Sequence, residues 1–297
     1  MKYLTRFDLE QDYLDYIEGG DAFLPNVSTI EETSEVKYNP EHDYSKDYFT
    51  IKALGNGTIT WAPTNTVQYS LNGGSWTNWN SSLAVSSGDT IRFKSSGNAT
   101  VAYRNQILTS SGNFDVYGNI MSLCYGDNFE GQYDIPFDYM FNSLFNHNRK
   151  TSTLINAENL ILPATGLTDT CYSMMFYNTP SLLTTPRELP ATIGYHACYL
   201  TMFSYCSGIT KSPIIRMDQA AAGSSQNSIC STMFDHCSSL NEITALGLVG
   251  ASGHIATSNF NNWVNSVAAT GTFTMTSGAS WPSGASGIPT GWTVVEV

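Results

Sequence analysis

A repeated pattern in the second half of this chain constrains its fold more than any other feature. Leu162–Phe176 and Leu189–Phe203 both begin with Leu-Pro-Ala-Thr and end with Met-Phe, and a looser copy runs from Ser228 to Phe234. With an earlier degenerate copy included, the methionines at 140, 175, 202 and 233 lie 35, 27 and 31 residues apart. A period of about 20 to 50 residues is typical of stacked repeats, in which each coil buries its apolar face against its neighbours.

The spacing of sulfur-containing residues inside each copy predicts a buried interior. Each full copy places a cysteine four residues before its methionine, a separation that puts both side chains on one face of a helical turn. A second cysteine follows the methionine by four residues in two copies, and Thr179 stands at that position in another. We expect buried columns of free thiols at Cys171, Cys198, Cys206 and Cys237, with Cys124 as a separate core residue.

Metal binding and disulfide bonding are the alternatives for the six cysteines. The chain has no C-x-x-C pair, and His196 near Cys198 and His236 beside Cys237 have no counterpart in the other copies. A zinc site needs four converging ligands, which this pattern does not supply. We therefore expect buried thiols, no metal and no cofactor.

A β module is expected ahead of the repeats, over residues 48–120. Alternation of apolar and polar residues predicts short strands at 49–54, 57–61, 67–71, 90–94 and 99–103. Turns rich in Gly and Asn separate these strands. The pattern predicts a small β-sandwich of immunoglobulin-like size.

Aromatic residues in this module form the candidate ligand-binding site. Trp76 and Trp79 lie near the Asn-Gly-Gly turn, together with Tyr69 and Asn72. Indole rings flanked by amides are suited to stacking on sugar rings. The alternative is that one tryptophan fills the core, with Trp61 the first choice.

Residues 1–47 are expected to form an attachment arm. They carry twelve acidic and four basic residues, a charge of −8 out of −12 for the chain. Helical spacing predicts a short amphipathic helix over 7–17, and a strand-like stretch follows. The candidate attachment residues are Leu24, Pro25, Val27, Ile30, Val36 and Tyr38. Such an arm has little core of its own and needs a partner chain, although a flexible acidic leader fits the same composition.

Composition excludes several classes of function. Only 13% of the residues are charged, and the net charge of −12 leaves no basic footprint for nucleic acid. The sequence has no apolar run of about 18 residues, so no membrane insertion is expected. Asp127 with Glu130 is a possible carboxylate pair, but both lie among turn residues, and an accessory module of a glycoside hydrolase is only a minor alternative.

The run from Gly118 to Phe129, the Leu-Pro-Ala-Thr and Met-Phe copies, and the tail 262–297 resemble the BspA-like leucine-rich-repeat proteins of gut Bacteroidales and their phages. The resemblance implies a leucine-rich-repeat solenoid with one short strand per coil, placed at a cell or virion surface, and binding without catalysis. Thr179 and the insert 214–227 depart from the family pattern. Residues 24–40 also look like the opening of structural proteins in Bacteroides phages, including crAss-like ones.

These observations predict a mainly β protein in three parts: an arm with a short helix at 1–47, an Ig-like β-sandwich at 48–120, and a BspA-like leucine-rich-repeat solenoid with a C-terminal cap at 121–297. The expected function is a non-enzymatic phage structural protein, a head fibre, tail fibre or decoration subunit, made in the host cytoplasm and located on the virion surface. The expected partners are capsid or tail proteins bound through the arm, further copies of the chain, and a host-surface glycan. A bacterial cell-surface adhesin of the BspA type is the alternative.

Overall fold

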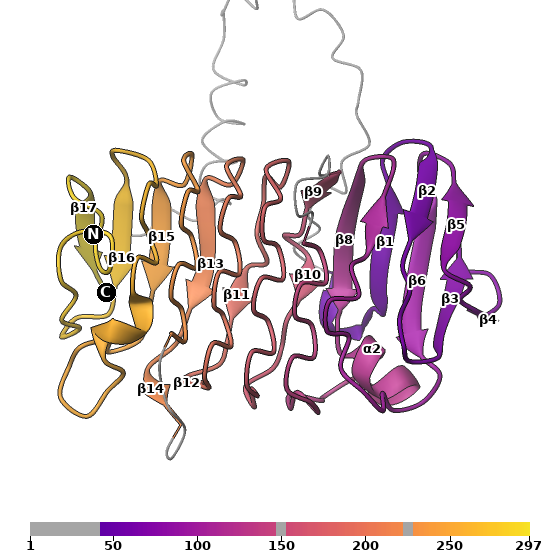
Figure 1. Cartoon of the computed structure of the whole chain (residues 1–297), viewed down its shortest axis with the longest axis horizontal. Coiled ribbons are helices and arrows are strands. Elements are labelled where there is room, and N and C mark those ends of the chain that lie inside the picture. The colour runs from indigo at the N-terminus through magenta and orange to yellow at the C-terminus, as the bar shows by residue number, and fades with distance from the viewer. Residues whose placement is uncertain (1–41, 147–152, 222–227) are drawn as a thin grey trace, which may run out of the picture. The chain divides into compact units, whose positions relative to one another are not determined.

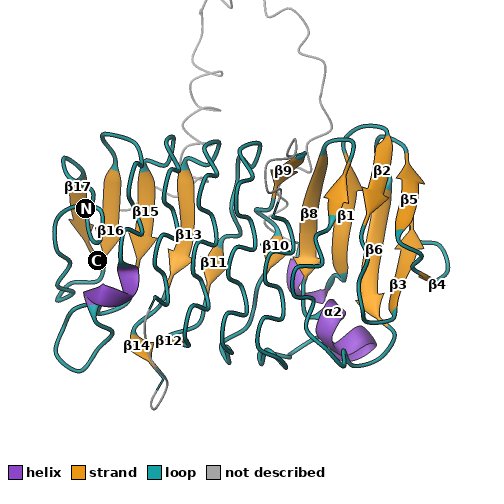
Figure 2. Ribbon diagram, viewed as in Figure 1, coloured by secondary structure: helices purple, strands orange, loops and turns teal. Residues whose placement is uncertain are grey.

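A computed structural model describes residues 42–146, 153–221 and 228–297, all within one compact unit that spans Val36–Val297 (Figure 1). The predicted arm helix and most of the attachment arm lie outside the described residues. The described chain is mainly β, as the sequence predicts, with strands joined by turns (Figure 2). Its few helical segments are short: η1 (Tyr44–Lys46), α2 (Ser122–Tyr125), η2 (Gly126–Asn128) and η3 (Thr257–Phe260).

The first part of the described chain consists of two antiparallel sheets. Its strands are β1 (Phe49–Ala53), β2 (Gly57–Thr60), β3 (Val67–Leu71), β4 (Thr77–Asn78), β5 (Ser82–Val85), β6 (Thr90–Ser95), β7 (Thr109–Ser110) and β8 (Phe114–Asn119). One sheet has the order β8-β1-β6-β3-β4 and the other β5-β2-β7. Four of the five predicted strands are present. Trp61 is fully buried and donates its indole N–H to the Gln106 carbonyl at 2.8 Å, so it is a core residue.

The predicted strand at 99–103 is wrong, and its burial does not follow the two-residue alternation of a strand. Ala99 and Tyr103 are buried while Val101 is 44% exposed. The backbone N–H of Ala99 donates to the Cys124 carbonyl, and that of Tyr103 donates to the Met140 carbonyl. The segment therefore finds its hydrogen-bond partners in helix α2 and in a turn rather than in a neighbouring strand.

Strand β8 belongs to both the antiparallel sheet and the parallel pairing that follows. It pairs antiparallel with β1, and it pairs parallel with β9 (Leu154–Asn156) and β10 (Leu160–Ile161). A second, parallel sheet has the order β11-β13-β15-β16-β17. Its strands are β11 (Glu188–Leu189), β13 (Lys211–Ile215), β15 (Glu242–Ala245), β16 (Thr272–Met275) and β17 (Thr293–Glu296), with β12 (Ile193–Gly194) and β14 (Gln219–Ala220) paired separately. We call each length of chain from one strand to its parallel neighbour a rung (Figure 1).

The Met-Phe segments are not helical, which corrects the expectation of a helical turn. They are runs of consecutive turns at 138–145, 169–178, 196–205, 229–236 and 261–266, which we call turn runs. Each carries a residue with positive φ at every fourth position, such as Thr170, Met174 and Asn178. Cysteine and methionine still face the interior together, because four residues complete one turn of the run.

Backbone amides in the turn runs alternate between two kinds of partner. Asn142 donates its N–H to the carbonyl three residues earlier, on Tyr139, at 3.1 Å. The adjacent Phe141 donates instead to the Cys171 carbonyl of the next rung at 2.8 Å, and the pattern repeats along the stack. An isolated helical turn is marginal in water, so a neighbouring rung that accepts every second N–H makes the turn run the more stable conformation.

Two columns of aromatic rings fill the interior between rungs. Phe145, Phe176, Phe203 and Phe234 lie in one column, with ring centroids 5.3, 5.1 and 5.5 Å apart and nearly parallel planes. Tyr103, Phe141, Tyr172 and Tyr199 form the other, at 6.3, 5.7 and 5.9 Å. Stacked aromatic pairs add about 0.5–1.5 kcal/mol each beyond the burial of their area.

The cysteine prediction is confirmed: all six cysteines are buried free thiols. Cys206 and Cys237 each donate their S–H to the carbonyl of a phenylalanine in the preceding rung, Phe176 and Phe203, at 3.0 Å. Thr179, which departs from the repeat pattern, donates its hydroxyl to the Phe145 carbonyl at 3.2 Å. The substituted residue therefore makes the same bond as the cysteines of its column.

Gly118 lies in β8, the strand that pairs antiparallel with β1 on one side and parallel with β10 on the other. Substitution of this glycine tests how closely the neighbouring backbone approaches β8. Its φ is 80°, and an added Cβ would lie 2.1 Å from the Tyr48 carbonyl oxygen. Gly73 has a similar φ of 76° with no atom within 4 Å. Gly73→Ala should cost about 1 kcal/mol through backbone strain alone, and Gly118→Ala more than about 2 kcal/mol because a clash is added. Urea unfolding measures both, and equal losses would contradict the close approach.

The buried thiols predict a loss of stability at alkaline pH. Burial raises the pKa of the Cys171 and Cys206 thiols to about 12 from an ordinary value of 9.0. Their contribution to stability is therefore complete below about pH 9 and is lost as the pH rises toward 12. Between these pH values, each thiol that ionises only on unfolding should lower the free energy of unfolding by roughly 1.4 kcal/mol per pH unit.

Urea unfolding at about pH 7, 9 and 10.5 measures this decline. As a control, alkylation of the unfolded, unreduced protein should modify all six cysteines. A disulfide-linked peptide in the mass map would contradict the thiol assignment.

Candidate ligand-binding surfaces

In the sequence-predicted aromatic site, Tyr69, Trp76 and Trp79 are half-buried and Asn72 is exposed. Trp76 is half-buried, and its ring covers the Lys94 ammonium group, with Nζ 4.5 Å from the ring centroid. Arg92 approaches the same ring at 5.5 Å, and Tyr48 contacts it edge-on at 4.9 Å. Trp76 therefore caps a cluster of charged groups, and part of its surface remains open to solvent.

The other three predicted residues, Trp79, Tyr69 and Asn72, make contacts inside the first module. The Trp79 ring contacts Tyr69 and Phe93 edge-on at 5.5 and 5.2 Å, and its indole N–H donates to the Trp61 carbonyl at 2.8 Å. Asn72 has a φ of 51°, which this turn requires, and its side-chain oxygen accepts from the Thr90 N–H at 2.8 Å. Trp76 and Trp79 are both half-buried, but Trp79 packs against the core residue Phe93, so Trp76 remains the candidate ligand contact.

The cluster beneath Trp76 is a closed ion pair. The Lys94 side chain is 9% exposed and donates to both carboxylate oxygens of Asp127, at 2.6 and 2.7 Å. This bond, together with one from the Tyr48 hydroxyl, lowers the pKa of Asp127. Burial and the bond to Asp127 raise the pKa of Tyr48 to about 12. The pairing of Lys94 with Asp127, and the bond from Tyr48 to the same carboxylate, favour a structural role for these three residues.

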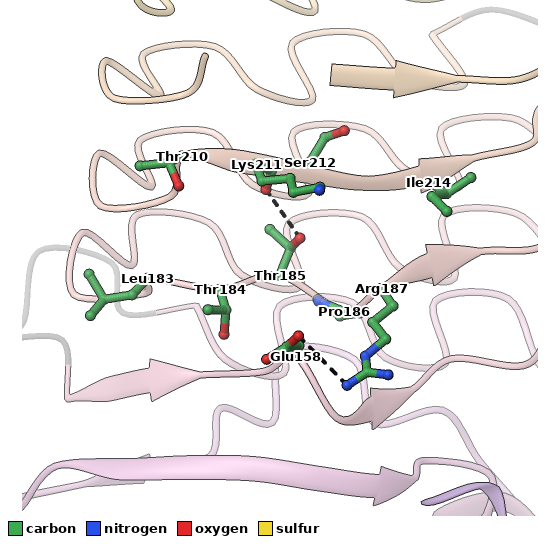
Figure 3. Close-up of a pocket in the computed structure, with 10 residues that line it drawn as sticks. All are labelled: Glu158, Leu183, Thr184, Thr185, Pro186, Arg187, Thr210, Lys211, Ser212 and Ile214. Atoms are coloured by element: carbon green, nitrogen blue, oxygen red, sulfur yellow. Dashed lines mark hydrogen bonds and ion pairs between the residues drawn. The ribbon is translucent and has the colours of Figure 1, made fainter. Parts of the chain in front are cut away.

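A groove that the sequence reasoning missed opens where the two large sheets meet. It has a volume of about 440 Å³ (Figure 3). Its lining residues are Glu158, Leu183, Thr184, Thr185, Pro186, Arg187, Thr210, Lys211, Ser212 and Ile214. A second cavity of about 380 Å³ shares Arg187 and is lined by residues that include Tyr133, Pro163 and Pro190. The repeated Leu-Pro pairs thus bring prolines of two copies to one surface.

The groove lies where the pairing of successive strands is missing. Among the described residues no strand pairing joins β10 to β11, and a single bridge between Asn156 and Thr184 links these rungs. Pro186 stands just before β11, and Pro213 lies where the β13–β15 register shifts. Proline has no N–H to give to a ladder, so Pro186 cannot extend β11 toward the preceding rung. The sheet continues past Pro213 with a register shift, because β13 pairs with both β11 and β15. In the sequence, a proline next to a predicted strand, such as Pro186, could have indicated this interruption of the sheet.

The groove offers aliphatic surface with hydroxyl groups and paired charges. Leu183 is 55% exposed, and Tyr133 beside the second cavity is 54% exposed. Arg187 lies 3.6 Å from Glu158 and donates to Asn159 at 2.8 Å, while Lys211 lies 3.4 Å from Glu242. The Thr185 hydroxyl donates to the Lys211 carbonyl (Figure 3). This surface suits an uncharged ligand with hydroxyl groups, since no excess of one charge attracts an ion.

The described part of the chain has neither a cluster of metal ligands nor a helix suited to a membrane. Among these residues, His, Cys, Asp and Glu side chains form no group of three or more that is placed to hold a metal ion. No helix there is long and apolar enough to cross a membrane. Part of the insert 214–227 is ordered in β13 and β14, and its residues 222–227 lie outside the described ranges.

Comparison of the chain with protein-family models, with curated proteins and with solved structures found no match. Its candidate surfaces are therefore interpreted from their own geometry and chemistry.

The different environments of the two tryptophans predict different effects of their removal. Trp79→Ala should lower the free energy of unfolding by about 3 kcal/mol, because it leaves a cavity beside Phe93. Trp76→Ala should cost only about 1 kcal/mol, through lost cation–π contact. Thermal and urea unfolding measure both variants. If Trp76→Ala is as destabilising as Trp79→Ala, the ring is a core residue and not a candidate ligand contact.

Proposed function

We propose that this chain is a non-enzymatic structural protein of a phage virion that presents a repeat surface for recognition of a host-surface glycan. In this proposal residues 48–120 form an Ig-like β-sandwich and residues 121–297 a BspA-like leucine-rich-repeat solenoid with a C-terminal cap. The successive parallel pairing of single short strands, one per rung, supports the repeat assignment. The resemblance of residues 24–40 to phage structural proteins supports the virion assignment.

The groove between β10, β11 and β13 is the observation that carries the proposed recognition. It combines exposed aliphatic surface at Leu183 with the exposed Thr210 side chain, and its charged side chains are paired. The hydroxyls of Thr184, Thr185 and Ser212 bond within the protein and fix the shape of the groove. Sugars present both apolar C–H faces and hydroxyl groups, so such a surface can satisfy both. Because the rungs form a rigid stack, the residues that line the groove keep their positions when a ligand binds.

The arm, residues 1–47, is proposed to attach the chain to capsid or tail proteins, and further copies assemble on the particle. Its acidic charge and its strand-like residues, from Leu24 to Tyr38, support this role. Attachment of many copies to one particle increases the strength of a weak contact, because binding of one groove raises the effective concentration of the others. Weak single-site binding is therefore sufficient for adsorption.

Particles carrying Leu183→Asp test the recognition role. The aspartate introduces an unpaired negative charge into the groove at a half-exposed position, so we expect adsorption to host cells to fall by about tenfold or more. Val101→Asp, at a 44% exposed position of the first module, is the matched control and should adsorb normally.

Mass spectrometry of purified particles tests the virion role in the same experiment. The chain should be present at equal abundance in wild-type and variant particles. Absence of the chain from particles would contradict the virion assignment, and normal adsorption of Leu183→Asp particles would show that the groove does not recognise the host.

A further inference from the structure

A row of exposed aromatic rings crosses three successive rungs on their outer surface. Tyr205 is 42% exposed, and its ring is stacked on the His236 ring with centroids 4.5 Å apart and planes 10° from parallel. Tyr177, half-buried, contacts Tyr205 edge-on at 5.9 Å. We call these three residues the outer aromatic row. It lies outside the buried ring columns, because Tyr205 and His236 follow the column residues Phe203 and Phe234 by two positions.

The backbone at this row is unfavourable for the residues that occupy it. Tyr205 has a φ of 63° and His236 a φ of 60°, in the left-handed region that bulky side chains rarely adopt. Asn178 takes the same position in the preceding rung, with a φ of 55°. Asparagine tolerates this conformation well, so the turn run does not itself require an aromatic side chain. Positive φ recurs at every fourth position of the turn runs and therefore belongs to their backbone. Tyr205 and His236 are distinguished by an exposed aromatic side chain that this backbone does not require.

Polar groups beside the row are fixed in position. The Asp235 carboxylate accepts from His236 Nδ1 at 2.8 Å and from Asn265 Nδ2 at 2.8 Å. Its side chain is 17% exposed. Tyr205 and His236 turn one face toward each other, so the row offers the remaining exposed surface of its rings beside an oriented carboxylate and an amide. Such a surface can contact the C–H groups of a sugar while the polar groups bond to its hydroxyls.

We infer that the outer aromatic row binds a neutral linear polysaccharide that lies across the rungs. This inference deepens the proposed function, on which it rests, by naming a second contact surface and its ligand class. Parallel strands repeat at about 4.8 Å, so equivalent positions of successive rungs form a straight line that suits a linear polymer. A polyanion is disfavoured by the adjacent Asp235 and by the net charge of −12.

The test uses a full-length double variant, Tyr205→Asn with His236→Asn. It places at both positions the residue that the neighbouring rung already carries at Asn178. Native gels cast with a linear β-glucan, a xylan or a mannan measure binding as retardation, and gels with hyaluronan give the polyanion control. Tyr195→Asn is the matched control, because Tyr195 is a 39% exposed tyrosine outside the row.

We expect the parent and Tyr195→Asn to be retarded by at least one neutral polymer and not by hyaluronan. The double variant should bind about tenfold more weakly, while its melting temperature does not fall, because strained backbone is relieved. Equal retardation of parent and double variant, or no retardation of the parent by any neutral polymer, would overturn the inference. A lower melting temperature with unchanged retardation would assign the row a structural role and also overturn it.

The groove variant separates this inference from the proposed function. Leu183→Asp should keep its retardation by the neutral polymer, because Leu183 is not part of the row. If Leu183→Asp loses retardation and the double variant keeps it, the row inference fails and the groove proposal stands. If Leu183→Asp adsorbs normally as part of the particle while the double variant loses retardation, the groove proposal fails and the row stands.

Discussion

The alternating hydrogen bonds of the turn runs are the constraint on which the rest of the described structure depends. Every second amide is satisfied within its own rung, as Ser173 is by Thr170, and the others bond to the next rung, as Tyr172 does to Cys198. A single rung therefore leaves half of its turn-run amides without partners. Because a buried unpaired amide costs about 1–3 kcal/mol, each rung is stable only beside another.

The same ladder sets which positions can vary. Inward positions must fill a column whose spacing is already fixed, so Thr179 can replace a cysteine only by making the same bond to a carbonyl in the preceding rung. Outward positions carry no such requirement. Asn178, Tyr205 and His236 share one backbone conformation with three different side chains. Recognition surfaces can therefore change on this scaffold without disturbance of its interior.

The antiparallel sheets provide the first surface on which rungs can stack. Strand β8 gives one edge to β1 and the other to the parallel strands β9 and β10. Phe49 of β1 packs against Phe145, the first ring of its column, at 6.1 Å. The antiparallel sheets thus cover the apolar surface of the first rung, and no separate polar capping rung is needed at that end of the stack.

The sequence by itself determined the mainly β class, most strands of the first module, the core position of Trp61 and the buried thiols. These features follow from local alternation and from repetition, which are visible in one chain. It did not determine the turn-run backbone, because the deciding partner of each second amide lies one rung away. The groove joins residues of three rungs, such as Glu158, Thr185 and Lys211, and the outer aromatic row joins Tyr205 to His236. Only the tertiary structure therefore brings the residues of each surface together.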